Sequence, residues 1–396
     1  MITVNEAKKS VLDNTTILSP ISLQLAESAN LILAEDVYSK IDFPPFNQSG
    51  MDGYAFKFRD WEGTNPLTIK GEIPAGDYPK KKLKAGEAIR IFTGAPLPKE
   101  ADTVVMQEKV SVENDRLIIR DSDLVEGAFV RKQGAQTSAG DIALKAFSKL
   151  SPAAVAFLAS IGCDRVEVFP HPIVRIITTG NELQVPGMPL EEGEVYECNS
   201  FGLLAALNEL GIHGKKHFTV RDHEKRITNT LKNHLDEADI VIFTGGVSVG
   251  DYDLVVKTLD TYGVRQIFHN VKQRPGKPLY FGLYKNTLVF GLPGNPASVL
   301  CCYYEYILPA IKKMMGSDDD FPITCKMPLA TTISKKVGLT YFVIGKISGK
   351  EVEPLPYRES YQLSSFALAD CIIKLDENVT ECHQGEVATV HLLKQQ

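Results

Sequence analysis

The stretch that most constrains the fold is residues 238–253, which read ADIVIFTGGVSVGDYD. Its apolar run IVIF, bounded by acidic residues and glycines, is typical of a strand buried in a parallel sheet. Gly245, Gly246 and Gly250 then predict a tight turn whose backbone N–H groups face an anion. A helix over residues 252–262 would follow this turn.

Two further stretches repeat the pattern of a strand that ends in a glycine turn. They are IVRIITTGNEL at residues 173–183 and TLVFGLPGNPAS at residues 287–298. The carboxyl ends of parallel strands share one edge of an open α/β sheet, and ligands bind at that edge. The sequence therefore predicts one site assembled from three strand ends.

Composition narrows the class of protein. The 396 residues suit about two to four domains, and 44% hydrophobic with 23% charged residues is typical of a soluble globular chain. A formal net charge of −6 without a basic stripe argues against a nucleic-acid binder. We expect no membrane segment, because no apolar run approaches the roughly 18–20 residues that span a bilayer. Seven cysteines without a CxxC pair, and no signal peptide, predict a reduced cytoplasmic protein.

The apolar patterns predict a multidomain α/β plus β protein. The linker unit is predicted from helical apolar spacing over residues 21–32 and from the capped helix LSPAAVAFLASIG at 150–162. Short alternating runs predict the β domains, and alternating strands and helices predict the α/β domain. The predicted parts are a helical linker unit (1–47 and 141–169), an inserted β-rich domain (48–140), a central α/β domain (170–317) and a C-terminal β domain (318–396).

The acidic residues near the strand ends each allow two interpretations. Asp251 and Asp253, beside the glycine turn, would hold Mg²⁺ together with substrate phosphates, or would cap and complement the following helix. Glu182 could bind a metal, position a water or cap a helix. Upstream, Asp52 lies between glycines, where an Asx-turn is the ordinary explanation, and Thr93 precedes a Gly-Ala-Pro turn.

Two proline-rich turns complete the set of motifs. RPGKP fixes Arg274 and Lys277 on a stiff turn, which suits an oxyanion; a solvated basic loop is the alternative. GLPGNP, in a strand-to-helix loop, is either a shaped wall of the site or a structural turn.

The motifs PPFNQSGMDGYA, IFTGAPLPKEADTVVMQE, TTGNEL, GGVSVGDYD, RPGKP and GLPGNPAS, in this order, closely resemble the molybdopterin molybdenumtransferase family (MoeA). Its relatives include the C-terminal domain of gephyrin. The resemblance covers nearly the whole chain, is weakest after residue 318, and implies a central domain similar to molybdopterin adenylyltransferase and a C-terminal β-barrel-like domain. It also implies an enzyme that inserts molybdenum from molybdate into adenylylated molybdopterin, with Mg²⁺-dependent hydrolysis and release of AMP.

The resemblance also assigns roles to residues. Catalytic roles fall on Asp52, Thr93, Glu182, Asp222 and Asp253, with Asp253 and Glu182 as metal ligands. The implied substrate-binding residues are Gly245, Gly246, Ser248, Gly250, Arg274, Lys277, Pro293, Gly294, Asn295, Pro296 and Ser364. The glycine turn and Ser248 would hold the pyrophosphate, and Arg274 with Lys277 would attract molybdate.

Some features depart from the family pattern, and other functions stay open. Ala135, Gln136 and Ile344 stand where the family usually has charged residues. One alternative is a non-catalytic molybdopterin-binding scaffold. Another is an adenylyltransferase, although GGVSVGDYD does not match the GGTG-type turn of that family. The expected partners are a second copy in a homodimer, a molybdopterin adenylyltransferase and molybdoenzyme acceptors, and neither nucleic acid nor a membrane.

Overall fold

The computed structural model describes residues 1–79, 82–247, 254–317, 322–356 and 362–393. They form two compact units, of which the first contains residues 1–21 and 169–396 and the second residues 22–168. The contacts therefore group the N-terminal helix α1 (Val4–Asp13) with the α/β region.

The first unit contains a six-stranded sheet in the order β17-β14-β18-β22-β21-β19. The strands β14, β17, β18 and β22 are parallel, whereas β21 and β19 are antiparallel at one edge. Their bounds are β14 (Val174–Thr179), β17 (Lys215–Val220), β18 (Ile240–Thr244), β19 (Arg265–His269), β21 (Tyr280–Tyr284) and β22 (Thr287–Leu292). The predicted buried strands are confirmed, and β21 pairs with β22 as an antiparallel hairpin.

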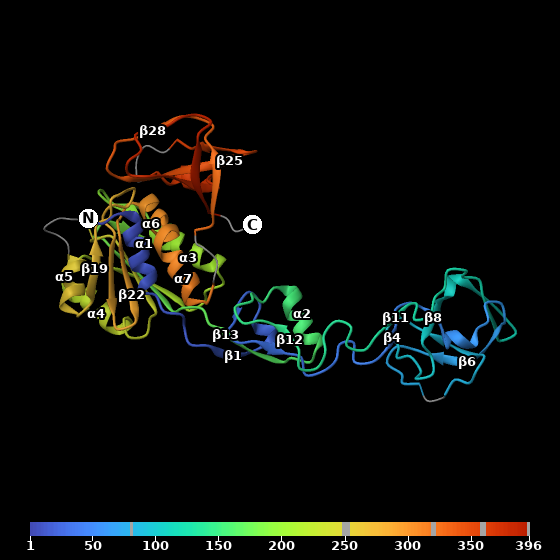
Figure 1. The fold of residues 1–396 in the computed structure, drawn as a ribbon. Coiled ribbons are helices and arrows are strands. Elements are labelled where there is room, and N and C mark those ends of the chain that lie inside the picture. The colour runs from blue at the N-terminus through green and yellow to red at the C-terminus, as the bar shows by residue number, and fades with distance from the viewer. Residues whose placement is uncertain (80–81, 248–253, 318–321, 357–361, 394–396) are drawn as a thin grey trace. The chain divides into compact units, whose positions relative to one another are not determined.

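Both faces of this sheet are covered by helices, which explains why β18 is apolar from Ile240 to Phe243. Ile240 and Ile242 belong to the core on one face, and Val241 and Phe243 to the core on the other. The first core includes residues of α1, α3, α6 and α7, and the second residues of α4 and α5 (Figure 1). The helices are α3 (Asn199–Glu209), α4 (Glu224–His234), α5 (Leu254–Thr261), α6 (Pro296–Cys302) and α7 (Leu308–Met314).

The C-terminal part of the chain is a second sheet, as the sequence predicts. Its strand order is β20-β25-β27-β29-β23, with β26 also paired to β25. The strand β20 comes from the α/β region and runs parallel to β25, with Gln273 opposite Thr340 and Arg274 opposite Tyr341. The elements are β20 (Gln273–Arg274), β23 (Thr324–Pro328), β24 (Ile333–Ser334), β25 (Thr340–Ser348), β26 (Glu351–Pro354), α8 (Leu363–Ala367), β27 (Cys371–Leu375), β28 (Glu381–Cys382) and β29 (Val387–Leu392).

The second unit contains a three-stranded sheet, in the order β1-β13-β2, and the helix α2 (Pro152–Ser160). The predicted helix at 150–162 is confirmed, because Ser151 Oγ accepts from the backbone N–H of Ala154 at 3.2 Å. The predicted helix over residues 21–32 is wrong. Those residues form β1 (Ile21–Gln24) and part of β2 (Ile32–Leu33), because pairing with β13 (Arg165–Phe169) outweighs the local helical spacing.

A mixed sheet in the order β8-β5-β7-β6-β10-β9 forms the rest of the second unit, as the alternating runs predict. The strand β5 packs closely on the edge strand β8, since a Cβ at Gly53 would lie 1.9 Å from Val105 O. The strands are β5 (Gly53–Phe56), β6 (Leu67–Ile73), β7 (Glu87–Ile91), β8 (Thr103–Met106), β9 (Val110–Glu113) and β10 (Arg116–Ile119). Shorter elements of this unit are η1 (Leu25–Glu27), β3 (Val37–Tyr38), β4 (Gln48–Ser49), η2 (Phe58–Asp60), η3 (Gln107–Lys109), β11 (Val130–Arg131) and β12 (Ile142–Leu144). The first unit also contains the short strands β15 (Leu183–Gln184) and β16 (Val195–Tyr196).

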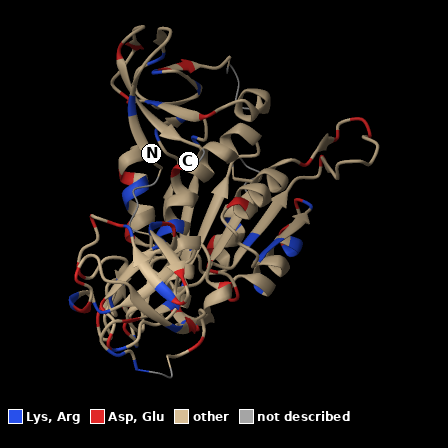
Figure 2. Ribbon diagram, turned by 90° about the vertical axis from the view of Figure 1, so that its right-hand side faces the viewer, with Lys and Arg blue, Asp and Glu red and all other residues tan. Residues whose placement is uncertain are grey.

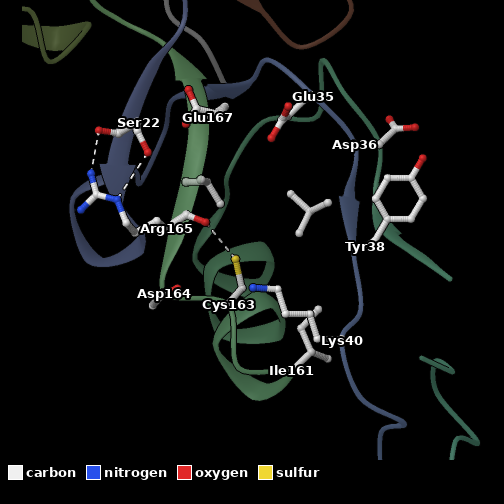
Figure 3. A pocket seen from close by; sticks show the side chains of 12 residues that line it. Ser22, Glu35, Asp36, Tyr38, Lys40, Ile161, Cys163, Asp164, Arg165 and Glu167 are labelled. Atoms are coloured by element: carbon white, nitrogen blue, oxygen red, sulfur yellow. Dashed lines mark hydrogen bonds between the residues drawn. The ribbon is translucent and has the colours of Figure 1, made fainter. Parts of the chain in front are cut away.

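The second unit also has an open cavity of about 340 Å³ (Figure 3). Cys163 Sγ donates to Arg165 O at 3.1 Å there, and the Arg165 guanidinium donates to Ser22 O, also at 3.1 Å. Burial raises the pKa of the Cys163 thiol, which disfavours its thiolate. All seven cysteines are free, as the sequence predicts.

The described helices include none that is long and apolar enough to cross a membrane. Acidic and basic residues are interspersed along the ribbon in Figure 2.

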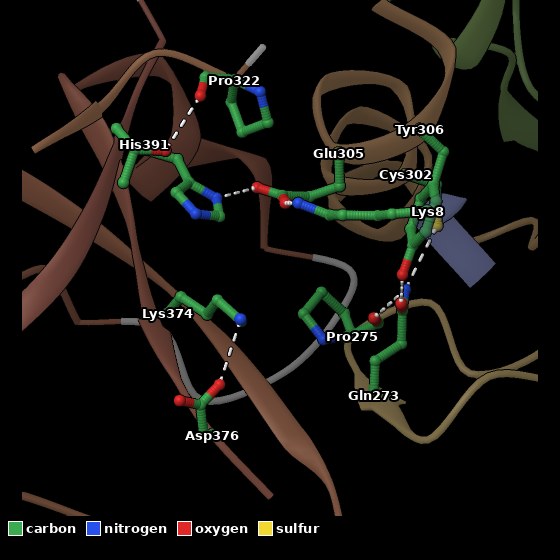
Figure 4. Close-up of polar contacts among 11 residues, drawn as sticks. Lys8, Gln273, Pro275, Cys302, Glu305, Tyr306, Pro322, Lys374, Asp376 and His391 are labelled. Carbon is green, nitrogen blue, oxygen red and sulfur yellow. Dashed lines mark hydrogen bonds and ion pairs between the residues drawn. The ribbon is translucent and has the colours of Figure 1, made fainter. Parts of the chain in front are cut away.

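A buried ion pair joins three segments of the first unit. Glu305 is fully buried on η4 (Tyr303–Ile307), the π-helical turn between α6 and α7. The Lys8 ammonium of α1 pairs with Glu305, and Glu305 Oε1 lies 2.7 Å from His391 Nδ1 of β29 (Figure 4). Burial opposes the charge, yet Lys8 and His391 together hold the pKa of the Glu305 carboxyl below its ordinary value.

We expect Lys8→Met to lower the free energy of unfolding by about 3–5 kcal/mol, because it removes the ammonium from the buried Glu305 charge and leaves only His391 beside it. The control is Lys9→Met, which removes an exposed pair with Asp13 and should cost about 0.3–0.5 kcal/mol. Urea denaturation at pH 7 measures both variants, and equal losses would contradict this account. Because the pKa of Glu305 is depressed, the pair's contribution declines as the pH falls below 4.5 and through the folded value.

Candidate functional site

A cavity of about 320 Å³ lies where the parallel strands β14, β17, β18 and β22 end. Its lining residues are Thr179, Glu182, Leu183, Asn199, Asp222, Thr244, Gly245, Gly246, Val247, Pro278, Pro293, Gly294 and Asn295. We call it the strand-end cavity. It lies at the edge that the sequence predicts, and it brings together predicted residues from four separate loops.

The glycine turn after β18 tolerates no side chain. Gly245 has a φ of +86°, and a Cβ there would lie 2.4 Å from Thr179 O. Gly246 has a φ of +64°, and a Cβ there would lie 2.8 Å from Val255 Cγ2. Only glycine adopts this backbone without strain while fitting so close to the end of β14. The predicted residues Ser248, Gly250, Asp251 and Asp253 lie outside the described residues.

Glu182 and Asp222 reach the cavity from neighbouring strand ends. A Cβ at Gly180 would lie 2.9 Å from both carboxylate oxygens of Glu182, so a glycine at 180 leaves room for that carboxylate. The Asp222 backbone N–H donates to Asn181 Oδ1 at 3.2 Å, which joins the two loops. Burial, and then the nearby charge of Glu182, raise the pKa of the Asp222 carboxyl, although contacts with Thr179 and Asn181 work in the opposite direction.

This pair of carboxylates suits a divalent cation. A cation would relieve the repulsion between Glu182 and Asp222 that raises the pKa of Asp222. Among the described residues there is no group of three or more His, Cys, Asp or Glu side chains that could surround a metal. Mg²⁺ is commonly bound by only one or two carboxylates together with substrate phosphates and water, so the two residues fit Mg²⁺.

The sequence did not single out Asn199, Thr179 or Thr244, although all three line the cavity. Asn199 begins α3 and its Nδ2 donates to Gly294 O at 2.9 Å, which fixes the GLPGNP loop. Its Oδ1 is buried without a hydrogen-bond partner in the described part of the chain. The only trace of this role in the sequence is that Asn199 stands directly before an apolar helical pattern. An asparagine at such a position is ordinarily interpreted as a helix cap.

The RPGKP turn is held from beneath by buried side chains. Gln273 is fully buried, and its Nε2 donates to Pro275 O at 3.0 Å and to Gly276 O at 3.1 Å (Figure 4). The Tyr306 hydroxyl of η4 donates to Gln273 Oε1. A Cβ at Gly276 would lie 2.5 Å from Cys302 Sγ, so the turn fits tightly against α6.

Three other predicted residues of the first unit lie near the strand-end cavity but do not line it. Arg274 and Lys277 are exposed on the RPGKP turn, which reaches the cavity through Pro278. The Arg274 guanidinium lies over the Tyr341 ring, 5.7 Å from its centroid. Pro296 begins α6 after the cavity residue Asn295.

Three further positions named from the sequence occupy distinct environments. Ser364 is exposed on α8 and is not among the lining residues of the strand-end cavity. Ile344, on β25, is fully buried in the core that also includes residues of α1, α6 and α7, which explains why an apolar residue suits this position. Ala135 and Gln136 are exposed in the second unit.

Asp52 and Thr93, in the second unit, form a local pair. Asp52 Oδ1 accepts from both the backbone N–H and the hydroxyl of Thr93, each at 2.7 Å. These two hydrogen bonds lower the pKa of the Asp52 carboxyl. Their catalytic roles remain predictions.

Three protein-family models match successive parts of the chain. They are "MoeA N-terminal region (domain I and II)" at residues 2–162, "Probable molybdopterin binding domain" at residues 175–313 and "MoeA C-terminal region (domain IV)" at residues 326–393. The matches, with the α/β sheet and its strand-end cavity, define the class as MoeA-type proteins with a molybdopterin-binding-like domain.

Similarity to individual relatives shows to which family the chain belongs. The chain is 31% identical to the molybdopterin molybdenumtransferase of Haemophilus influenzae over 99% of this chain and 100% of the relative. It is 40% identical to that of a Nostoc species over 72% of this chain and 67% of the relative. The crystal structure of the Pyrococcus horikoshii molybdopterin biosynthesis MoeA protein matches over 100% of both chains, with a TM-score of 0.85 and 29% identity. The chain belongs to the molybdopterin molybdenumtransferase family.

We expect Glu182→Gln to lower the pKa of Asp222, because the substitution removes the like charge that helps raise it. Carboxyl-carbon NMR titration measures this pKa directly. A raised carboxyl pKa means that the folded protein binds the proton more tightly than the unfolded chain does. The site therefore costs stability at neutral pH, and Glu182→Gln should slightly raise the melting temperature there. Glu192→Gln, an exposed acid in another loop, is the control and should leave Asp222 unchanged.

We expect Tyr306→Phe to lower the free energy of unfolding by about 1–3 kcal/mol, because it leaves the buried Gln273 oxygen without its donor. Tyr303→Phe is the matched control. Tyr303 is equally buried on the same turn, but its hydroxyl has no hydrogen-bond partner among the residues described, so the loss should be under about 0.5 kcal/mol. Chemical denaturation compares the two, and a larger loss for Tyr303→Phe would disprove the role of the Tyr306 hydrogen bond.

Proposed function

We propose that this chain is a molybdopterin molybdenumtransferase that inserts molybdenum from molybdate into adenylylated molybdopterin, with Mg²⁺-dependent hydrolysis and release of AMP. The supporting observation is the strand-end cavity. It combines the Glu182 and Asp222 carboxylates with the turn at Gly245 and Gly246, where the backbone leaves no room for a side chain. Curated relatives that match most of this chain carry the same activity in their names. The proposal includes a cytoplasmic homodimer.

The proposed hydrolysis uses the groups that line the cavity. Water attacks the phosphorus on the adenylate side of the phosphoanhydride, the bond to the bridging oxygen breaks, and that oxygen stays with molybdopterin phosphate. Asp222 accepts a proton from the attacking water, since its carboxylate lines the cavity together with Glu182. The Gly245 backbone N–H donates to Leu292 O at 3.1 Å, so in this proposal the Gly246 N–H is the donor of the turn that stabilises the negative charge on the phosphate oxygens.

Glu182 would hold Mg²⁺, and Asp253 stays a predicted second ligand from the sequence. When bound, Mg²⁺ neutralises charge on the phosphate oxygens. The Asn199 side chain keeps the Gly294 loop in place, and its buried Oδ1 is available to accept a hydrogen bond from the substrate.

Molybdate is an oxyanion and needs donors rather than carboxylates. Arg274 and Lys277 supply positive charge on a turn that Gln273 and Tyr306 hold in one conformation. In this proposal molybdate binds on the RPGKP turn, and hydrolysis takes place at the carboxylates. In the proposed homodimer, the Asp52–Thr93 pair of a second copy would complete the site.

The test is release of AMP from adenylylated molybdopterin, with Mg²⁺ and with or without molybdate. We expect molybdate-dependent release by the wild type. Asp222→Asn and Glu182→Gln should each lower the rate by about 10²–10⁴-fold, the usual range for an acid–base group. Glu192→Gln, which carries an exposed acid that does not line the cavity, should retain the wild-type rate.

Two results would contradict the proposal. One is a folded wild type that releases no AMP under these conditions, which would favour the scaffold function. The other is undiminished release by Asp222→Asn and Glu182→Gln, which would place the chemistry away from the strand-end cavity.

A further inference from the structure

A second cavity, of about 540 Å³, adjoins the strand-end cavity. Leu183 lines both cavities. The lining residues are Gly180, Asn181, Leu183, Gln184, Glu194, Thr219, Val220, Arg221, Arg226, Asn229 and Thr230. We call it the arginine cavity, after Arg221 and Arg226. Its volume lies within the range of roughly 300–1,000 Å³ that is typical of small-molecule sites.

The same two loops build both cavities. After β14, Glu182 lines the strand-end cavity and the preceding Asn181 lines the arginine cavity. After β17, Asp222 lines the strand-end cavity and the preceding Arg221 lines the arginine cavity. Adjacent residues therefore serve two compartments of opposite charge, which share the wall formed by these loops.

The two arginines are available for a ligand. Arg221 and Arg226 are exposed, and within the described part of the chain neither guanidinium makes a hydrogen bond or ion pair with another residue. The one carboxylate that lines the cavity, Glu194, accepts from the Glu191 backbone N–H at 2.9 Å and from Gln184 Nε2 at 3.3 Å. Asn181 Oδ1 already accepts from Asp222, which leaves its amide N–H groups as donors. The donors thus outnumber the acceptors, which suits an oxyanion.

We propose that the arginine cavity binds the phosphate of the AMP half of the substrate, an inference that rests on the proposed function. Arg221 and Arg226 supply planar donors that suit phosphate oxygens, and neither Glu182 nor Asp222 is among the residues that line this cavity. With the AMP phosphate in the arginine cavity, the phosphoanhydride lies at the wall between the cavities, within reach of the acidic side. Hydrolysis adds negative charge to AMP, and the guanidiniums stabilise that charge.

The experiment is calorimetric titration of the full chain with AMP, which requires no turnover. We expect Arg221→Gln and Arg226→Gln each to weaken AMP binding about tenfold to hundredfold, because each removes charge-assisted hydrogen bonds. Arg265→Gln is the matched control, because Arg265 is exposed and lines neither cavity. Unchanged melting temperatures confirm that the variants are folded.

Two further titrations identify the group that is bound. Inorganic phosphate should compete with AMP in the wild type, and adenosine should bind with the same affinity to the wild type and to the arginine variants. Molybdate that displaces AMP more effectively than phosphate does would overturn the assignment, since the cavity would then be a molybdate site. Wild-type affinity for AMP in both arginine variants would overturn it as well.

The AMP-release assay separates this inference from the proposed function. A wild type that binds AMP through its arginines, but releases none from adenylylated molybdopterin, would retain the phosphate site and refute the transferase. If the wild type shows molybdate-dependent release of AMP, and both arginine variants bind AMP with wild-type affinity, the transferase proposal stands and the phosphate site is refuted.

Discussion

The parallel pairing of β18 with β14 on one side and β22 on the other is the constraint on which the site depends. Val174, Ile240 and Leu288 lie opposite one another in register, and so do Thr178, Thr244 and Leu292 at the other end. The carboxyl ends of β14, β18 and β22 therefore lie side by side at the same edge of the sheet. Because β18 buries alternate residues in two different cores, a slip of one residue would exchange those faces, and this fixes the register. The loops that carry the acids, the glycines and the prolines are placed by this register.

The sequence predicted this region well because a buried parallel strand has an unambiguous signal. A short run of β-branched and aromatic residues followed by glycines suits few other structures. The helix over residues 21–32 failed for the opposite reason. Of its apolar positions, Leu25 enters the core while Ile21 and Ala29 are exposed, because the segment is organised by pairing with a strand far along the chain. Local spacing carries no information about such a partner.

The same limit applied within the site. Glu182 and the GLPGNP loop could be placed at the strand ends from the sequence, since they directly follow predicted strands. Asn199 and Gln273 could not, because their roles depend on carbonyl groups that only the folded chain brings near them. The proximity of Glu182 to Asp222 likewise results from the neighbouring positions of β14 and β17, which the sequence does not specify.

The two-residue strand β20 has a consequence for the modularity of the chain. It belongs to the RPGKP turn and is also a strand of the C-terminal sheet, where Gln273 and Arg274 lie opposite Thr340 and Tyr341. A break before residue 318 would leave the pairing edge of β20 open to other strands and would remove the ring beneath Arg274. Recombination between relatives would therefore preserve the geometry of the cationic turn only when the turn and the C-terminal sheet are inherited together. The α/β region and the C-terminal sheet are separate in chain order, but at β20 they would have to be inherited as one piece.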